Sequence, residues 1–384
     1  MKIYLSLLMG VLSAVPMFGQ TANKPQQVGA AGYEQQRIRD ESRDRPIQLD
    51  IWYPASAQEQ EHNYGISKGS VATGAAVAGS RLPVVLLSHG SMGAASNYSW
   101  LAEYLARRGY VVLGVSHFRE SPVFGMDTID PASVSRFDER VKDLNFALDY
   151  LIDRSKFAAS LDPGRISLIG HSSGGASVLM MSGVSFSAAG LGEYCQKNLS
   201  GNDKGCMYPH SAKVAEMSIP HSIRAFRAVV AMDPAVGPGF TKDALRTLTT
   251  PTLIIASMKD DFLPFASHAG YIAGEIKGSR LIKLDQAAGH FVFLDACNLP
   301  IKAMGVPLCT DAPGIDRDSI HKTVAADIVQ FLDRKMKEHL AALHSGTDAT
   351  KYSRNTTSVS FRPLPGPFLR CRRACLYPPL GQFR

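Results

Sequence analysis

Short apolar runs alternate with amphipathic segments along most of the chain. The runs are typical of parallel strands buried on both faces of a sheet, and they lie at residues 82–90, 110–117, 166–170, 226–234, 250–261 and 279–291. Apolar positions recur at helical spacing in the intervening residues 97–109, 135–153 and 319–343. The pattern predicts an α/β fold with a mostly parallel central sheet and helices on both faces.

Four further segments lack this clear alternation of strands and helices. Residues 36–54 alternate polar and apolar positions and end in IQLDIWYP, which predicts a strand, whereas the small, polar residues 55–80 predict a loop. Residues 183–220 form a small irregular insert after the helix that begins near Gly174. From residue 345 to 384 Pro, Arg, Thr and Ser dominate without periodicity, which predicts a disordered basic tail. A single domain is therefore expected over residues 28–344.

The first residues have the pattern of a signal for export. One Lys precedes an apolar run from Ile3 to Val15, followed by small and turn-forming residues. The run is too short to span a membrane as a helix, and we interpret residues 1–22 as a signal peptide. The mature protein is expected to be periplasmic or secreted, without a transmembrane segment.

The cysteines agree with export. Four of the six form two close pairs, Cys195 with Cys206 and Cys297 with Cys309. An oxidising compartment favours disulfide bonds within these pairs. A zinc site is disfavoured because neither pair has C-x-x-C spacing, so no metal is expected.

The formal net charge of +7 would suit binding to nucleic acid, but its distribution does not. Residues 351–384 contain seven Lys and Arg and no Asp or Glu, so the remaining chain is close to neutral. The body has no basic patch interleaved with aromatic residues, and no nucleic-acid partner is expected. The arginines of the tail leave open a role in binding anionic surfaces.

One short motif suggests nucleophilic catalysis. Gly170-His171-Ser172-Ser173-Gly174 fits G-x-S-x-G, which exposes a serine on a sharp turn between a strand and a helix. Ser172 is the predicted nucleophile, which needs a neighbouring base to remove its proton. The alternative is that these small residues serve only close packing of the strand and the helix.

The partners of Ser172 can be sought by position. The backbone N–H groups of Ser173 and of Ser91, in LLSHGSMG, are the predicted oxyanion hole, although the latter segment also suits a simple turn. His290, on a loop late in the chain, is the predicted base. Asp260 and Asp233 both end strands, so the acid is predicted as Asp260 with Asp233 as the competitor. Of the other histidines, His171 is interpreted as a packing residue and His321 as a surface or packing residue. His89 and His117 are interpreted as pocket residues that do not react.

Several motifs together resemble the α/β-hydrolase superfamily. They are IQLDIWYPA, LSHGSMG, LAEYLARRGYVV, GHSSGG, VVAMDPAVGPGF and GHFVFLDAC, and the resemblance spans residues 28–343. Within the superfamily the chain looks similar to exported proteins identified as predicted dienelactone hydrolases, which are related to platelet-activating-factor acetylhydrolases. The acetylhydrolases place the acid at the position of Asp233, and other relatives at that of Asp260. True dienelactone hydrolases have a cysteine where this chain has Ser172.

The resemblance implies hydrolysis of small-molecule esters or lipids without a metal or an organic cofactor. Apolar residues of the insert and of the helix before it, including Met180, Leu191 and Tyr194, would line the pocket or pack in the core. A thioesterase or peptidase would use the same residues, and a non-catalytic binding protein of the same fold remains a further alternative. The sequence does not predict the oligomeric state.

Overall fold

A computed structural model describes residues 29–198, 202–207, 219–220, 222–284, 287–297 and 299–344. The predicted signal peptide 1–22, the tail 345–384 and part of the insert 183–220 therefore lie outside the described residues. Contacts divide the chain into the units Met1–His339 and Leu340–Arg384, and the fold given below is that of the first unit. Among the described residues, none of the helices combines the length and the apolar character needed to cross a membrane.

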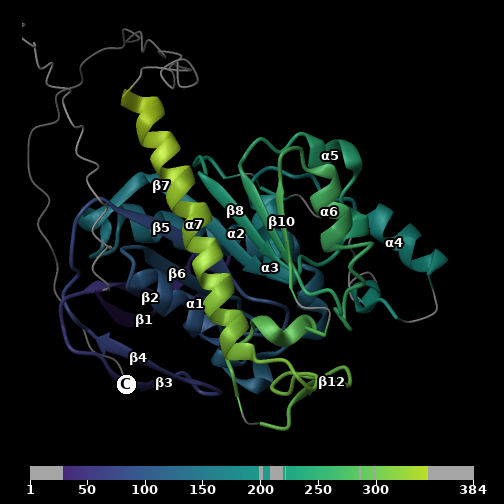
Figure 1. Cartoon of the computed structure of the whole chain (residues 1–384), viewed down its shortest axis with the longest axis horizontal. Helices are drawn as coiled ribbons and strands as arrows, with labels where there is room; N and C mark the ends of the chain where they lie inside the picture. Colours follow the sequence, from purple (N-terminus) through teal and green to yellow (C-terminus); the bar gives the residue numbers. More distant parts are fainter. Residues whose placement is uncertain are drawn as a thin grey trace, which may run out of the picture. The chain divides into compact units, whose positions relative to one another are not determined.

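The centre of the fold is a ten-stranded sheet with the order β10-β9-β8-β7-β5-β6-β2-β1-β4-β3 (Figure 1). Strands β10, β9, β8, β7, β5 and β6 run parallel to one another, and β2 pairs antiparallel with β6 and with β1. The bounds of the strands in this sheet are β1 Ala30–Asp40, β2 Arg45–Ala55, β3 Gln60–Asn63, β4 Lys68–Thr73, β5 Leu82–Ser88, β6 Val111–Ser116, β7 Leu161–His171, β8 Ala228–Met232, β9 Thr252–Ala256 and β10 Arg280–Lys283. The mostly parallel sheet that the sequence predicts is confirmed.

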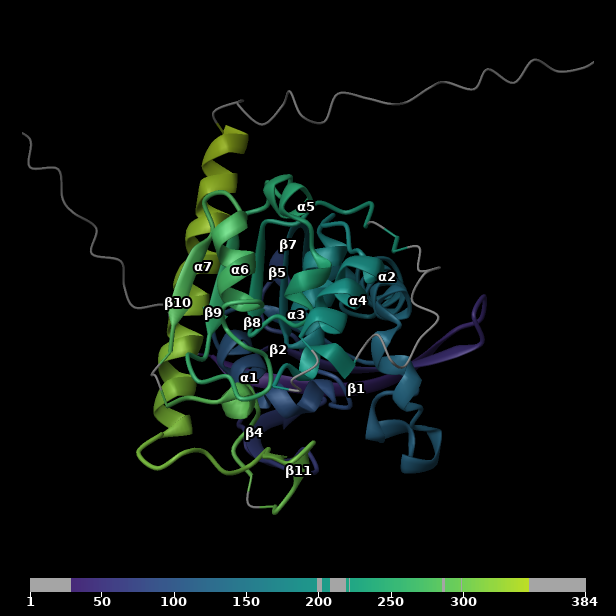
Figure 2. The ribbon, with the colours of Figure 1, turned by 90° about the vertical axis from the view of Figure 1, so that its right-hand side faces the viewer.

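Helices cover both faces of this sheet. Their bounds are α1 Ser99–Ala106, α2 Phe137–Asp153, α3 Ser173–Met181, α4 Ala188–Lys197, α5 Lys242–Arg246, α6 Ala269–Glu275 and α7 Arg317–His344. Figure 2 shows α7 on one side of the sheet and α2 and α3 on the other. Each face has its own apolar core, because the strands are buried on both sides and alternate side chains point to opposite faces.

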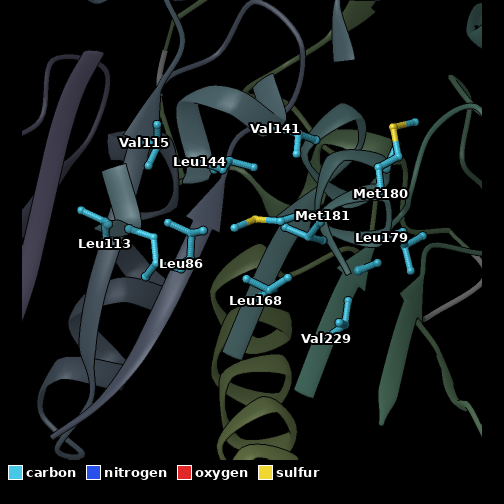
Figure 3. Packing of buried hydrophobic residues seen from close by; sticks show 14 of the residues in the cluster. Leu86, Leu113, Val115, Val141, Leu144, Leu168, Leu179, Met180, Met181 and Val229 are labelled. Carbon is cyan, nitrogen blue, oxygen red and sulfur yellow. The ribbon is translucent and has the colours of Figure 1, made fainter. Parts of the chain in front are cut away.

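The core beneath α2 and α3 consists mostly of aliphatic side chains. Figure 3 shows Leu86, Leu168 and Val229 of neighbouring strands facing Leu144 of α2 and Met181 of α3. All five are at most 1% exposed to solvent. Burial of a side chain of this size contributes about 1.5–3 kcal/mol, so the two helices are held firmly on the strands that carry the candidate site.

Two regions contain more regular structure than the sequence predicts. Residues 30–40 form β1, which pairs with β2 over its whole length. The expected loop 55–80 contains β3 and β4, and β4 joins the sheet through a parallel pairing of Gly32 with Ala72. The prediction of a loop is wrong because the partner strand supplies the stabilisation that the small polar side chains do not.

Part of the insert has regular structure that the sequence analysis does not predict, since residues 188–197 form α4. Its N-terminus is capped by Ser187, whose hydroxyl accepts a hydrogen bond from the N–H of Gly190 at 3.0 Å. Ser187 was the available signal, but two glycines within the helix obscured it. The disulfide bond between Cys195 and Cys206 closes the segment that follows. The second predicted bond, between Cys297 and Cys309, is present as well.

The insert is attached to the loop between β9 and α6. The backbone N–H of Lys204 donates to the carbonyl of Phe262 at 2.9 Å. The carboxylate of Asp203 accepts from Nε2 of His268 at 2.9 Å, and both side chains are buried. The disulfide-closed segment is therefore tied to the loop that also carries Asp260.

Candidate active site

The turn between β7 and α3 places Ser172 at the carboxyl edge of the sheet. Its backbone has φ 55° and ψ −120°, a conformation that is rare and unfavourable for a residue with a side chain. The turn is held on both sides, because the N–H of Ser172 donates to the carbonyl of Met232 and its carbonyl accepts from the N–H of Ala235, each at 3.0 Å. This strained turn has the conformation that G-x-S-x-G predicts for a nucleophile elbow.

The two glycines of the motif allow the strand and the helix to approach each other. A Cβ added to Gly170 would lie 2.2 Å from the carbonyl oxygen of Gly174, and one added to Gly174 would lie 2.0 Å from that of Ser88. Both contacts involve backbone atoms, which cannot move away as a flexible side chain could. The glycines are therefore required by the close packing around Ser172.

We expect Gly174→Ala to destabilise the protein by about 3 kcal/mol, since the added methyl group overpacks a rigid contact. Gly192→Ala is the matched control, because nothing lies within 4 Å of a Cβ at that position in α4. The control should be neutral or stabilise the protein by up to about 1 kcal/mol. Urea unfolding followed by circular dichroism measures both, and equal stabilities of the two variants would contradict the packing argument.

His290 and Asp260 form a hydrogen-bonded pair beside the elbow. Nδ1 of His290 lies 2.8 Å from Oδ2 of Asp260, and the imidazole is 1% exposed. Oδ1 of Asp260 accepts from the backbone N–H groups of Phe262 and Leu263 at 2.8 and 2.7 Å. The ring of Phe262 is stacked on the imidazole, with centroids 5.1 Å apart. Three N–H groups thus hold the carboxylate while the phenyl ring limits rotation of the imidazole.

Asp233 lies near the same imidazole but in a different setting. Its Oδ2 is 3.9 Å from Nδ1 of His290, beyond hydrogen-bond distance. The carboxyl group instead accepts from the backbone N–H and the hydroxyl of Ser257. Burial, followed by the charge of Asp260, raises the pKa of Asp233 well above its usual range. The protonated form of Asp233 is therefore favoured.

The two predicted oxyanion residues lie side by side. The hydroxyl groups of Ser91 and Ser173 are hydrogen-bonded to each other across 82 positions of the chain. Gly90 brings the backbone before Ser91 close to the elbow, since a Cβ at Gly90 would lie 3.3 Å from the Cβ of Ser172. The loop after β5 and the start of α3 are thus adjacent at the predicted nucleophile.

His171 and Tyr98 connect the loop after β5 with the loop of His290. The hydroxyl of Tyr98 accepts from the N–H of Gly90 at 3.0 Å and lies 2.8 Å from Nδ1 of His171. Nε2 of His171 lies 3.1 Å from the carbonyl oxygen of His290, to which it can only donate. Burial lowers the pKa of His171 well below its usual range, and the neutral ring satisfies all of these bonds. The role of Tyr98 is not visible in the sequence.

Further buried histidines and a buried aspartate lie near the site. His89 and His117, interpreted from the sequence as pocket residues that do not react, are fully buried, and burial lowers the pKa of both. Asp295 accepts from the N–H and hydroxyl of Ser99 and from the N–H of Trp100, which fixes the start of α1 to the loop after His290. No local sequence signal predicts Asp295, because its partners are almost 200 positions away.

His321, interpreted from the sequence as a surface or packing residue, is buried, and its burial affects how the stability of the protein depends on pH. Its ring is stacked on Trp100, and Nε2 donates to the carbonyl of Val292 at 2.7 Å. Burial lowers its pKa from 6.5 to about 4. Because the unfolded state then binds more protons below pH 6.5, this group makes the free energy of unfolding fall as the pH decreases from 6.5 towards 4.

We expect this effect of His321 to amount to about 2 kcal/mol between pH 7 and pH 5. In His321→Gln the amide can still donate to Val292, but the titrating group is absent. Urea unfolding at the two pH values should therefore show a smaller loss of stability for the variant than for the unsubstituted protein. The same loss in both proteins would exclude His321 as the source.

Among the described residues, one group in this site has the residue types and the spacing of metal ligands. One ligand atom each of His171, Asp233 and His290 lies within 4.8 Å of the others. Their hydrogen bonds already account for the arrangement, since His290 binds Asp260 and Asp233 binds Ser257. Their geometry is that of a hydrogen-bonded network.

Sequence comparisons give short matches to esterases. No protein-family model matches the chain. It is 32% identical over 100 residues to Cutinase 2 of Thermobifida cellulosilytica, a match that covers 25% of this chain and 33% of the relative. It is 34% identical over 95 residues to a bis(hydroxyethyl) terephthalate hydrolase of Streptomyces coelicolor, covering 25% of this chain and 26% of the relative. The matches thus span a third or less of these relatives.

A structural comparison covers much more of the chain. The structure is similar to that of a ferulic acid esterase from Streptomyces cinnamoneus, with a TM-score of 0.54 and 19% sequence identity. The similarity covers 82% of this chain and 92% of that one. Together with the parallel strands, the covering helices and the elbow at the end of β7, this similarity shows that the chain has the α/β-hydrolase fold.

Proposed function

We propose that the protein is a serine hydrolase that cleaves carboxylic esters. The observation that carries the proposal is the strained elbow at Ser172, next to the bonded pair His290–Asp260. The residue preceding the nucleophile, His171, is itself one hydrogen bond from the backbone of His290. A base oriented by a carboxylate beside an elbow serine is the arrangement that activates a weak hydroxyl nucleophile.

The reaction follows from these roles. Ser172 attacks the ester carbonyl while His290 takes the proton of its hydroxyl, and the N–H groups of Ser91 and Ser173 stabilise the oxyanion. His290 then gives the proton to the leaving alcohol, so an acyl-enzyme remains at Ser172. Water, deprotonated by His290, attacks the acyl group, which leaves as the carboxylic acid and restores the serine hydroxyl.

Asp260 is the proposed acid of the triad. Its carboxylate accepts the Nδ1–H of His290, which fixes the imidazole with Nε2 available for Ser172. Asp233 is 3.9 Å away, bonded to Ser257 and favoured in its protonated form, so it suits a structural role beside the dyad. The half-buried rings of Phe262 and Phe291 flank His290 and would contact an apolar part of the substrate.

The comparisons support ester substrates in particular. The names of the relatives and of the similar structure all describe ester hydrolases. Thioester and amide hydrolysis use the same residues and remain the alternative activities. Assignment to the group of predicted dienelactone hydrolases and acetylhydrolases rests on the motifs alone. The two disulfide bonds support export into an oxidising compartment.

The test is a panel of p-nitrophenyl esters from acetate to dodecanoate, measured beside a matched thioester and a matched anilide. We expect saturable ester hydrolysis that exceeds anilide hydrolysis, and labelling of Ser172 by a fluorophosphonate, located by mass spectrometry of the peptides. A folded protein that neither hydrolyses these esters nor is labelled would overturn the proposal. If the protein cleaves the thioester or the anilide in preference to the esters, the proposed substrate class would change, whereas the proposed catalytic residues would stay the same.

A further inference from the structure

A buried arginine lies directly behind the loop that carries Ser91. Arg140, on α2, is fully buried and forms a bidentate pair with Glu120, whose side chain is also buried. Its Nε and Nη2 lie 3.0 and 2.6 Å from the two carboxylate oxygens. The third arm of the guanidinium, Nη1, donates to the backbone carbonyl of His89 at 2.8 Å. Neither Arg140 nor Glu120 takes part in the reaction proposed above.

The contact with His89 fixes the first peptide unit of the loop. The carbonyl of the His89–Gly90 peptide is held by Arg140, and the N–H of the same peptide donates to the hydroxyl of Tyr98 at 3.0 Å. A trans peptide is planar, with its C=O and N–H pointing in opposite directions. Two bonds at opposite ends of the unit therefore set the orientation of its plane.

The next peptide unit is fixed from its carbonyl side. The carbonyl of Gly90 accepts from Nδ1 of the His89 ring at 2.6 Å and from the N–H of Gly93 at 3.2 Å. The opposite end of this planar unit is the N–H of Ser91, so its direction follows from these bonds. The His89 ring is held in turn, because its Nε2 accepts from the backbone N–H of His117 at 3.2 Å.

We propose that Arg140, oriented by Glu120, is a positioning residue for the oxyanion donor at Ser91. The guanidinium holds the His89 carbonyl and thereby fixes the orientation of the His89–Gly90 peptide. The Gly90–Ser91 peptide, which carries the Ser91 N–H, follows directly from it. This role rests on the proposed esterase function, because a fixed direction of the Ser91 N–H matters only where an oxyanion forms. Arg140 itself touches neither the substrate nor the reacting atoms.

An ion pair at this position is better explained by positioning than by stability. Removing two charges from water costs about as much as their attraction returns, so a buried pair is often replaceable by apolar residues without loss of stability. A guanidinium, unlike an apolar side chain, presents several N–H groups in one plane and can donate hydrogen bonds to a carboxylate and to a carbonyl at the same time. Preorganised donors are what stabilise charge in a transition state.

The main test is the paired variant Arg140→Met/Glu120→Leu, which removes both charges and leaves neither one buried alone. For p-nitrophenyl acetate we expect kcat to fall about 10–100-fold with KM changed by less than about threefold, since a misplaced donor weakens the transition state more than the bound ester. Affinity for a phenylboronic acid, which forms a tetrahedral adduct with the serine, should fall in parallel. Affinity for benzoate, which forms no such adduct, should remain.

Arg140→Lys is the second variant, because it keeps the charge beside Glu120 but lacks the fork. It should show the same pattern with a smaller decrease of kcat. The matched control is Arg317→Met/Asp311→Leu. Arg317 also binds a carboxylate bidentately, and its Nη1 donates to the backbone carbonyls of Leu294 and Asp295. The control should retain kcat and boronic acid affinity at a temperature where all the variants are folded.

The outcomes separate this proposal from the proposed function. Absence of ester hydrolysis in the unsubstituted protein would reject the function itself. If that protein is active, a folded paired variant with unchanged kcat and boronic acid affinity overturns the role of Arg140. Equal losses in the Arg140 and Arg317 variants would also overturn it, as would losses confined to thermal stability. If the paired variant does not fold, Arg140→Lys decides by the same measurements.

Discussion

Ser172→Ala is expected to lower kcat for p-nitrophenyl acetate by about 10⁶-fold, to the residual rate that binding and the oxyanion hole provide. The hydroxyl is the only group of the elbow that forms the acyl-enzyme in the proposed reaction. Alanine removes it without a bulky addition, so the fold should be unchanged. Steady-state rates measured with a Ser172→Ala preparation free of other esterases give the magnitude.

Ser177→Ala is the matched control for this substitution. Ser177 is a buried serine of α3, one turn after Ser172, and its hydroxyl donates at 2.8 Å to the carbonyl of Ser173, not to the N–H that the proposed reaction uses. We expect it to keep kcat within about threefold of the unsubstituted value, as for a residue that forms no interaction in the transition state. If folded Ser172→Ala were as active as the control, the glycines of the motif would serve packing alone and no acyl-enzyme at Ser172 would be tenable.

Asp260→Asn should reduce kcat by about 10⁴-fold, the second-largest effect that we expect. The carboxylate accepts the Nδ1–H of His290, whereas an amide that keeps its oxygen on the N–H groups of Phe262 and Leu263 would turn its NH₂ group towards His290. The imidazole would then adopt the other tautomer, which leaves Nε2 protonated and unable to accept the serine proton.

Asp233→Asn provides the internal comparison. A protonated carboxyl group and an amide are similar in shape and both neutral, and burial together with Asp260 favours the protonated form of Asp233. We therefore expect a decrease of kcat of no more than about tenfold. The reverse order of effects, with both variants folded, would transfer the acid role to Asp233.

The elements around the site could be predicted because their signals are local. The apolar runs that end at Ser88 and Gly170 form strands whose last residues are all buried. The sharp turn needs glycine at both 170 and 174. Parallel strands bring their carboxyl ends to one edge of the sheet, so the sequence alone predicts that Ser172 and His290 belong to the same site.

The acid could not be assigned from the sequence, for a physical reason. Asp233 and Asp260 both follow strands at the same edge, and their distances to His290 differ by about one ångström, 3.9 against 2.8 Å. The difference arises from Ser257 and from the N–H groups after Asp260, which hold the two carboxyl groups in place. Such contacts depend on loop conformation, which has no periodicity to detect.

Long-range polar contacts were missed for a similar reason. Arg140 appears in the sequence as one polar residue of an amphipathic helix, yet it is fully buried beneath the His89 carbonyl. Strands β3 and β4 were missed because their residues depend on a neighbouring strand for stability. In both cases the deciding partner is distant along the chain, so the local pattern alone could not indicate it.

The attachment of the insert limits how this protein can be changed. The disulfide-closed segment contacts Phe262 through Lys204 and His268 through Asp203, and Phe262 is stacked on the imidazole of His290. Residues 202–207 of the insert and the loop 257–268 are therefore held together by direct contacts. A chimera that receives the insert of another hydrolase would therefore need that enzyme's counterpart of the loop 257–268 as well. Without it, the transplanted segment would lack the partners that His268 and Phe262 provide here.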